Sequence, residues 1–154
     1  PDVNAAIGNA QLENAELFRE ERQKAVEYYY SHLKDIKTID LPLCHIPYED
    51  HSWHIFQIFI KENSAVGRNQ FIEKMSEAGI GTSVHYKPLH RMTYYKTKYK
   101  LDPSDFPNTE KAWKGTVSLP LYPFMKESEL EYVCNTIKSI LVEKKIYIND
   151  QSTY

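Results

Sequence analysis

The sequence predicts an α+β fold in which about three strands form a sheet flanked by helices, with a long helix at the N-terminus. Three observations predict it. Residues 4–34 carry apolar side chains at helical spacing, residues 53–60 are rich in aromatic and β-branched side chains, and residues 127–144 have the pattern of an amphipathic helix. Helices and strands that follow one another in this way pack as small α+β layers.

Length and composition indicate a single domain over residues 1–154. The chain has 42% hydrophobic and 26% charged residues, which is typical of a globular protein that buries a core. Its formal net charge of -2 provides no general attraction to nucleic acid or anionic lipid. No apolar run approaches the length of about 18 residues that a membrane span needs. We therefore expect neither nucleic acid nor a membrane as a partner.

Residues 1–36 are predicted to form one long linking helix. Phe18, Ala25 and Tyr29 recur at spacings of seven and four, which places them on one helical stripe. The central part of this helix, residues 4–34, would be about 45 Å long at 1.5 Å per residue. A helix of that length extends beyond a small domain, so we expect it to pack on another part of the protein.

The strand candidates surround a short helix. Residues 53–60 are predicted to form a central strand with both faces covered, because most of their side chains are apolar. A helix is predicted at 67–78, and Gly79 stands where a left-handed helix cap belongs. A second strand is expected at 80–86 and a third at 117–119.

The rest of the chain is expected to be loop or helix. Prolines and polar residues indicate loops at 38–52 and 87–107. A short helix is predicted at 108–115, and residues 146–154 are expected to form a polar tail.

The candidate binding residues are His85, Tyr86 and His90. They lie where the predicted second strand runs into a loop that contains Pro88, and binding groups are often displayed on such loops. Histidine and tyrosine donate hydrogen bonds to phosphate or hydroxyl oxygens, and a tyrosine ring stacks on a flat ring. This chemistry favours an anionic or nucleotide-like ligand. The alternative is an ordinary surface loop that contains one buried, hydrogen-bonded histidine.

Other catalytic or metal centres find little support in the sequence. Cys44 and Cys134 stand far apart, and the chain contains no C-x-x-C or H-E-x-x-H string. It also contains no G-x-S-x-G or Walker-type sequence. We therefore predict no catalytic residue and no metal ligand in this chain, and we expect reduced cysteines in a cytoplasmic protein.

Three sequence strings stand in order along the chain. Residues 4–12 read NAAIGNAQL, residues 79–90 read GIGTSVHYKPLH, and residues 106–123 contain FPNTE and SLPLYP. Together they resemble the C-terminal region of the DegT/DnrJ/StrS family of sugar aminotransferases. The resemblance implies that the chain is the small C-terminal domain of a fold-type I enzyme that uses pyridoxal phosphate (PLP).

The resemblance also implies an activity for the parent enzyme. Such an enzyme would move an amino group from an amino acid, with glutamate as the expected donor, to a keto group of a nucleotide-linked sugar in polysaccharide biosynthesis. It would act as a homodimer in which the loop after the second strand reaches the active site of the partner. There His85 and Tyr86 would contact the sugar nucleotide, and His90 would bind substrate or shape the loop.

The family's Schiff-base lysine lies upstream of the matched stretch, and no lysine of this chain stands in the expected strand-to-loop setting. The chain alone is therefore expected to bind no PLP and to be inactive. Two alternatives stay open. One is a non-catalytic module that binds a nucleotide-sugar or nucleic acid through strand aromatics such as Trp53 and Phe56. The other is a regulatory homologue of the same family that has lost the aldimine chemistry.

Overall fold

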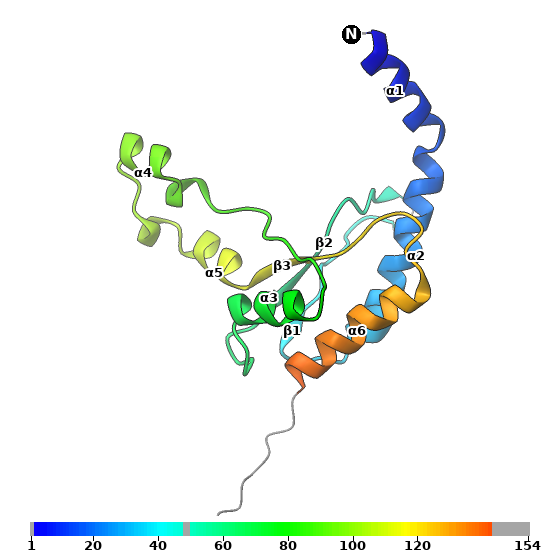
Figure 1. Ribbon diagram of the computed structural model, residues 1–154. Helices are drawn as coiled ribbons and strands as arrows, with labels where there is room; N and C mark the ends of the chain where they lie inside the picture. Colours follow the sequence, from blue (N-terminus) through cyan, green and yellow to red (C-terminus); the bar gives the residue numbers. More distant parts are fainter. Residues whose placement is uncertain (1, 48–49, 143–154) are drawn as a thin grey trace, which may run out of the picture.

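A computed structural model describes residues 2–47 and 50–142 (Figure 1). At its centre lies a three-stranded antiparallel sheet in the order β1-β2-β3. Its strands are β1 (Ile39–Asp40), β2 (Phe56–Ile60) and β3 (Thr116–Leu119). The predicted α+β class and the number of strands are therefore confirmed.

β1 lies within residues 38–52, which the sequence predicted to be a loop. It pairs with the end of β2, where Ile39 stands opposite Ile60. Lys61 follows β2 and places its Nζ 2.7 Å from Oδ1 of Asp40. A strand of two residues is too short to produce an alternating sequence pattern, so only its pairing reveals it.

The segment 80–86 was predicted as the second strand, and this prediction is wrong. The segment meets the sheet at one antiparallel bridge, between Ser83 and Ser118. The backbone groups of these two residues exchange hydrogen bonds of 3.1 and 2.8 Å. Pro120 follows β3 and has no amide hydrogen, so the ladder cannot continue on that side.

β2 contributes alternate side chains to the hydrophobic core. Phe56 and Ile60 are buried with the isoleucine between them, whereas Gln57 and Phe59 are half-buried. The prediction of two covered faces therefore holds fully for one face only. The strand also begins three residues later than predicted, because Trp53 has a φ of 45°, outside the extended region.

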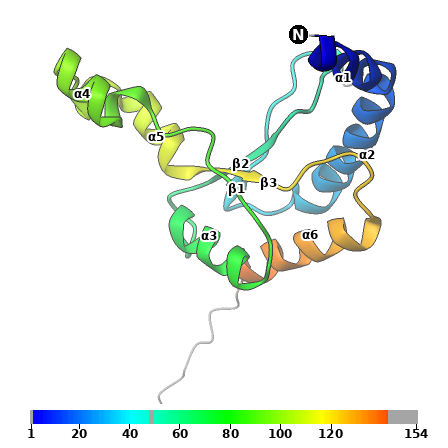
Figure 2. The ribbon, with the colours of Figure 1, turned by 45° about the horizontal axis from the view of Figure 1, so that its top comes forward.

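Three helices pack beside the sheet (Figure 2): α2 (Ala15–Leu33), α3 (Arg68–Glu77) and α6 (Glu127–Leu141). α6 contacts both α2 and α3, and α3 contacts β3. Gly79 follows α3 with a φ of 73°, so the predicted helix and its left-handed cap are confirmed. The largest fully buried side chains of the core are Trp53, Tyr29, Phe56, Phe71, Leu33, Ile58, Met75 and Ile137.

The N-terminal helix was predicted as one element over residues 1–36, and it is interrupted at Asn14. α1 (Asp2–Glu13) precedes this residue and α2 follows it. The Asn14 backbone takes a ψ of 2°, and its side-chain amide donates a hydrogen bond to the carbonyl of Ala10 at 3.0 Å. Asparagine side chains compete for backbone groups in this way and weaken a helix. α1 buries none of its residues and extends away from the sheet (Figure 1).

Residues 89–115 form an arm that projects from the sheet (Figure 2). It consists of η2 (Leu89–Arg91), α4 (Thr93–Tyr99), η3 (Pro103–Asp105) and α5 (Pro107–Gly115). α5 confirms the short helix that the sequence predicted there. α4 lies in a stretch that was expected to be mostly irregular. It buries no side chain, and a helix with no buried face needs no apolar stripe that would reveal it in the sequence.

Within the described residues, no helix is both long enough and apolar enough to cross a membrane. Cys44 and Cys134 are free thiols. The predicted polar tail at 146–154 lies outside the part of the chain that the structure describes.

Candidate functional site

The loop of residues 83–92 joins the sheet to the arm and carries the three predicted site residues. It begins at the bridge from Ser83 to Ser118 and ends where α4 begins. Pro88 lies in it at a φ of -60° and directly precedes η2. The peptide bond between His85 and Tyr86 is cis.

His85 is held against the sheet by two contacts. Its Nδ1 lies 2.8 Å from the hydroxyl oxygen of Ser118, and its carbonyl accepts a hydrogen bond of 2.9 Å from the side-chain amide of Gln57. Ser118 belongs to β3 and Gln57 to β2, so both partners come from the rigid part of the fold. Among the described residues, Nε2 of His85 has no hydrogen-bond partner. This nitrogen is therefore available to a ligand.

Tyr86 points away from the core and is 76% exposed. Its ring meets the His85 ring edge-on, with centroids 4.8 Å apart and planes at 80°. Beside the two rings lies a hollow of about 270 Å³. It is lined by Gln57, Val84, His85, Tyr86, Pro88, Thr109, Ala112, Trp113 and Thr116. An exposed phenol beside an imidazole and a small hollow suits a flat or hydroxyl-bearing ligand.

His90 has a different environment, since it is only 4% exposed. Its Nε2 lies 2.5 Å from Oε1 of Glu110, and its ring stacks on Phe106 with centroids 4.6 Å apart. The structure therefore separates His90 from the pair His85–Tyr86. In this chain its imidazole is engaged inside the arm, which is the environment expected of a residue that shapes the loop.

Glu110 on α5 binds two consecutive residues of the loop. Besides His90, it accepts two hydrogen bonds of 2.6 Å from Nε and Nη2 of Arg91. This paired geometry, in which both guanidinium nitrogens meet both carboxylate oxygens, is the strongest form of such contacts. The carboxylate is almost completely shielded, because Glu110 is 8% exposed.

The hydrogen bonds from Arg91 and, to a smaller extent, the one from His90 lower the pKa of Glu110 from 4.5 to about 2. The same contact raises the pKa of Arg91. Glu110 is therefore ionised at neutral pH and only accepts hydrogen bonds, so Nε2 of His90 carries the proton in their contact.

Trp113 extends the cluster one helical turn beyond Glu110. The Arg91 guanidinium lies over its ring at 4.7 Å from the centroid, and Arg68 of α3 lies at 5.5 Å. Cations over an indole face are attracted by its negative quadrupole. Because Trp113 also lines the hollow beside Tyr86, one wall of that hollow is fixed by the same contacts.

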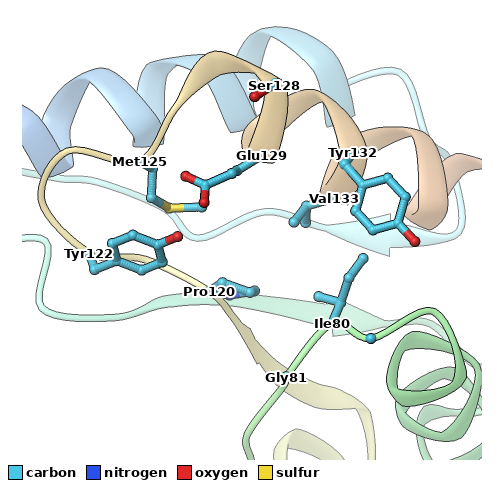
Figure 3. A pocket seen from close by; sticks show the side chains of 10 residues that line it. Ile80, Gly81, Pro120, Tyr122, Met125, Ser128, Glu129, Tyr132 and Val133 are labelled. Carbon is cyan, nitrogen blue, oxygen red and sulfur yellow. The ribbon is translucent and has the colours of Figure 1, made fainter.

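A second hollow of about 480 Å³ lies at the start of α6 (Figure 3). Two of its polar side chains bind within the chain. Oε2 of Glu129 accepts a hydrogen bond of 2.8 Å from the amide of Lys126, which caps the helix, and the Tyr132 hydroxyl donates to the carbonyl of Ala78 at 2.9 Å. None of the predicted site residues lines it, so we place the candidate site at the 83–92 loop. The hollow at the start of α6 is lined by the residues labelled in Figure 3, which are Ile80, Gly81, Pro120, Tyr122, Met125, Ser128, Glu129, Tyr132 and Val133.

Comparison with known proteins identifies the family. The family model of the DegT/DnrJ/EryC1/StrS aminotransferase family matches residues 1–138. The chain belongs to this family.

Two curated relatives of this chain are much longer than the chain itself. The spore coat polysaccharide biosynthesis protein SpsC of Bacillus subtilis is 32% identical over 144 residues, which cover 91% of this chain and 36% of that protein. The uncharacterized protein MJ1066 of Methanocaldococcus jannaschii is 32% identical over 145 residues, covering 94% of this chain and 37% of that protein. The chain thus spans little more than a third of these relatives.

Solved structures of aminotransferases share its fold. The putative sugar aminotransferase Spr1654 from Streptococcus pneumoniae, in its PLP form, has a TM-score of 0.82 at 27% identity, covering 92% of this chain and 36% of that one. PseC of Helicobacter pylori, an aminotransferase involved in the biosynthesis of pseudoaminic acid, also gives 0.82, at 20% identity, over 90% and 37% of the two chains. The predicted likeness to part of a PLP aminotransferase is therefore confirmed at the level of the fold.

Sequence reasoning missed the residues that support the loop of this family member. Ser118 and Glu110 stand inside strings that were recognised, SLPLYP and FPNTE, but neither spacing shows that they bind His85 and His90. The sequence signal is that a basic pair, His90 and Arg91, stands near one end of the arm and a carboxylate, Glu110, stands near the other end. Within the described residues, no group of three or more metal-binding side chains is present.

Proposed function

We propose that this chain is the C-terminal part of a PLP-dependent aminotransferase that moves an amino group from an amino acid, such as glutamate, to a keto group of a nucleotide-linked sugar. Family membership supports the reaction class. The names of two relatives, a putative sugar aminotransferase and a polysaccharide biosynthesis protein, support a sugar as substrate. The observation that carries the proposal is the exposed Tyr86 ring, which lies with the half-buried His85 beside a hollow.

In this proposal His85 and Tyr86 bind the sugar nucleotide. The contact with Ser118 fixes the plane of the His85 imidazole and leaves Nε2 to donate or accept at a sugar hydroxyl or a diphosphate oxygen. The exposed Tyr86 ring and hydroxyl provide a stacking face and a further donor. His90 acts indirectly, by holding the loop through Glu110.

PLP in the parent enzyme would supply the electron sink for amino transfer. A lysine that binds it covalently is normally desolvated or placed beside another cation, so that it is neutral enough to react. None of the lysines in the described residues is buried. The lysines of residues 2–47 and 50–142 therefore do not fit the buried type of PLP lysine, which supports our proposal that the cofactor is held by other parts of the full-length protein and that this segment alone is inactive.

We further propose that the parent is a cytoplasmic homodimer in which the loop reaches the partner's active site. The projection of the arm from the sheet supports a contact outside this chain (Figure 2). The alternative of an aromatic nucleic-acid-binding sheet is disfavoured, because Trp53 and Phe56 are buried. Light scattering of the full-length protein at several concentrations tests the dimer, and a stable monomer would contradict it.

An amino-transfer assay with the full-length protein tests the proposed activity. The protein is incubated with PLP, glutamate and a set of nucleotide-linked keto sugars. We expect one equivalent of 2-oxoglutarate for each amino sugar formed, and no reaction with the same keto sugars lacking the nucleotide. Transfer to the free sugars at equal efficiency would contradict recognition of the nucleotide, and a protein that forms no product from any acceptor would fit the regulatory homologue instead.

A further inference from the structure

We propose that Glu110 is the positioning residue of the 83–92 loop: by binding His90 and Arg91 together, it sets where His85 and Tyr86 stand. This inference rests on the proposed substrate role of that pair. It adds a residue that does not line the hollow beside Tyr86 and that acts through the geometry of the loop.

The loop has one fixed end at the sheet. The bridge between Ser83 and Ser118, the contact from Ser118 to His85 and the hydrogen bond from Gln57 attach it to β2 and β3. Beyond His85 the described residues offer Tyr86 no hydrogen bond, and its only ring contact is with His85. The sheet alone therefore does not fix the position of Tyr86.

The second fixed end is Glu110. Its carboxylate joins three hydrogen bonds, one from His90 at 2.5 Å and two from Arg91 at 2.6 Å. The stretch between His85 and His90 is short and includes Pro88, whose ring restricts the backbone. Displacement of the second end would therefore move Tyr86 directly.

The geometry requires a charged, forked acceptor at position 110. A neutral amide keeps the shape of glutamate but replaces one acceptor oxygen with a donor, which opposes a guanidinium nitrogen. Arg91 also lies over Trp113, which lines the hollow beside Tyr86. Loss of the Glu110 contact would thus disturb both the loop and one wall of the hollow.

The test compares Glu110→Gln with Asp105→Asn in the full-length protein loaded with PLP. Asp105 is an exposed carboxylate of the same arm, so its variant makes the same charge change without touching the loop. The first readout is hydrogen exchange of the amides of residues 84–92. We expect at least about tenfold faster exchange in Glu110→Gln and no change in Asp105→Asn, because only the first loses an anchor. Equal exchange in both variants would overturn the proposal whatever the substrate is.

The second readout is the dissociation constant for the sugar nucleotide, measured in a double-mutant cycle with Tyr86→Ala. We expect Glu110→Gln to weaken binding by about tenfold and to have little further effect once Tyr86 is removed, because it acts through that residue. PLP retention should stay unchanged. Fully additive effects would overturn the positioning role, whereas a Tyr86→Ala variant with wild-type affinity would refute the proposed substrate contact and leave the exchange readout to decide the role of Glu110.

A second variant guards against a general loss of folding in Glu110→Gln. Arg91→Lys keeps the positive charge but cannot form the paired contact or lie flat over Trp113. We expect faster exchange in residues 84–92, smaller in size than in Glu110→Gln, with wild-type circular dichroism. Unchanged exchange in Arg91→Lys together with global unfolding of Glu110→Gln would overturn the proposal.

Discussion

Nδ1 of His85 lies 2.8 Å from the hydroxyl oxygen of Ser118, so the candidate substrate loop is joined to the buried edge of β3. The same serine forms the backbone bridge to Ser83. One residue of the sheet therefore sets both the path of the loop and the orientation of the imidazole. This link makes the position of His85 sensitive to a change inside the fold.

Replacement of Ser118 by Ala should weaken sugar-nucleotide binding. The backbone bridge would remain, but the His85 ring would lose its partner, and we expect a three- to tenfold higher dissociation constant, roughly the value of one hydrogen bond. Titration of the full-length protein measures it. Ser139→Ala is the control, because that hydroxyl binds only the carbonyl of Thr136 on the surface of α6. Equal effects of the two variants would count against an orienting role of Ser118.

The contribution of Glu110 to stability should depend on pH. Its pKa is about 2 in the folded state and near 4.5 when the chain is unfolded, so its stabilising contribution is complete above pH 4.5 and is lost as the pH falls toward 2. The gap in free energy of unfolding between the wild type and Glu110→Gln should therefore be largest near neutral pH and shrink steadily below pH 4.5. Denaturant unfolding of both proteins across this range measures the gap. A gap that is constant with pH would show that the carboxylate charge contributes nothing.

Tyr29→Phe should destabilise the fold by about 1–2 kcal/mol. The buried Tyr29 hydroxyl donates to the carbonyl of Pro120 at 2.7 Å, and its removal leaves that carbonyl without this donor. Tyr28→Phe is the matched control, since Tyr28 is only half-buried and its ring stacks on His32. Chemical denaturation of the two variants gives the comparison, and a larger loss for Tyr28→Phe would contradict the assignment.

Gly115→Ala should be costly because α5 approaches β2 closely at this residue. A Cβ there would lie 2.4 Å from Cε2 of Phe59 and 2.6 Å from the carbonyl oxygen of Ile60. Relief of such a clash requires a backbone shift, and we expect a loss of about 1–3 kcal/mol in the free energy of unfolding. Gly67→Ala has open space around its added carbon and should cost less than about 1 kcal/mol. Similar melting temperatures for the two variants would disagree with the packing described here.

The sequence predicted correctly the elements whose residues carry their own signal, such as an apolar stripe or a terminal glycine. The stripe from Leu130 to Leu141 located α6 to within a few residues, and Gly79 marked the end of α3 because glycine readily adopts positive φ. The segment 80–86 has the composition of a strand, yet it forms one bridge, since strand formation depends on a partner and Pro120 ends that partner.

Long-range contacts decided what the sequence left open at the site. His85, Tyr86 and His90 look equivalent along the chain, but only the fold separates an exposed phenol from a buried imidazole. That separation comes from Glu110, twenty residues from His90, and no periodicity connects the two. The substrate roles of His85 and Tyr86 and the loop-shaping role of His90 are predictions that binding measurements test.

The most direct test of the central claim is the affinity of the full-length protein for its sugar nucleotide after Tyr86→Ala, beside the exposed control Tyr132→Ala on α6. We predict at least about tenfold weaker binding for Tyr86→Ala, since stacking of a nucleotide base on an aromatic side chain contributes on the order of 1–3 kcal/mol, with PLP retained at the wild-type level. The control should bind as the wild type does. Unchanged affinity in Tyr86→Ala, or a parallel loss of sugar nucleotide and PLP, would contradict the account.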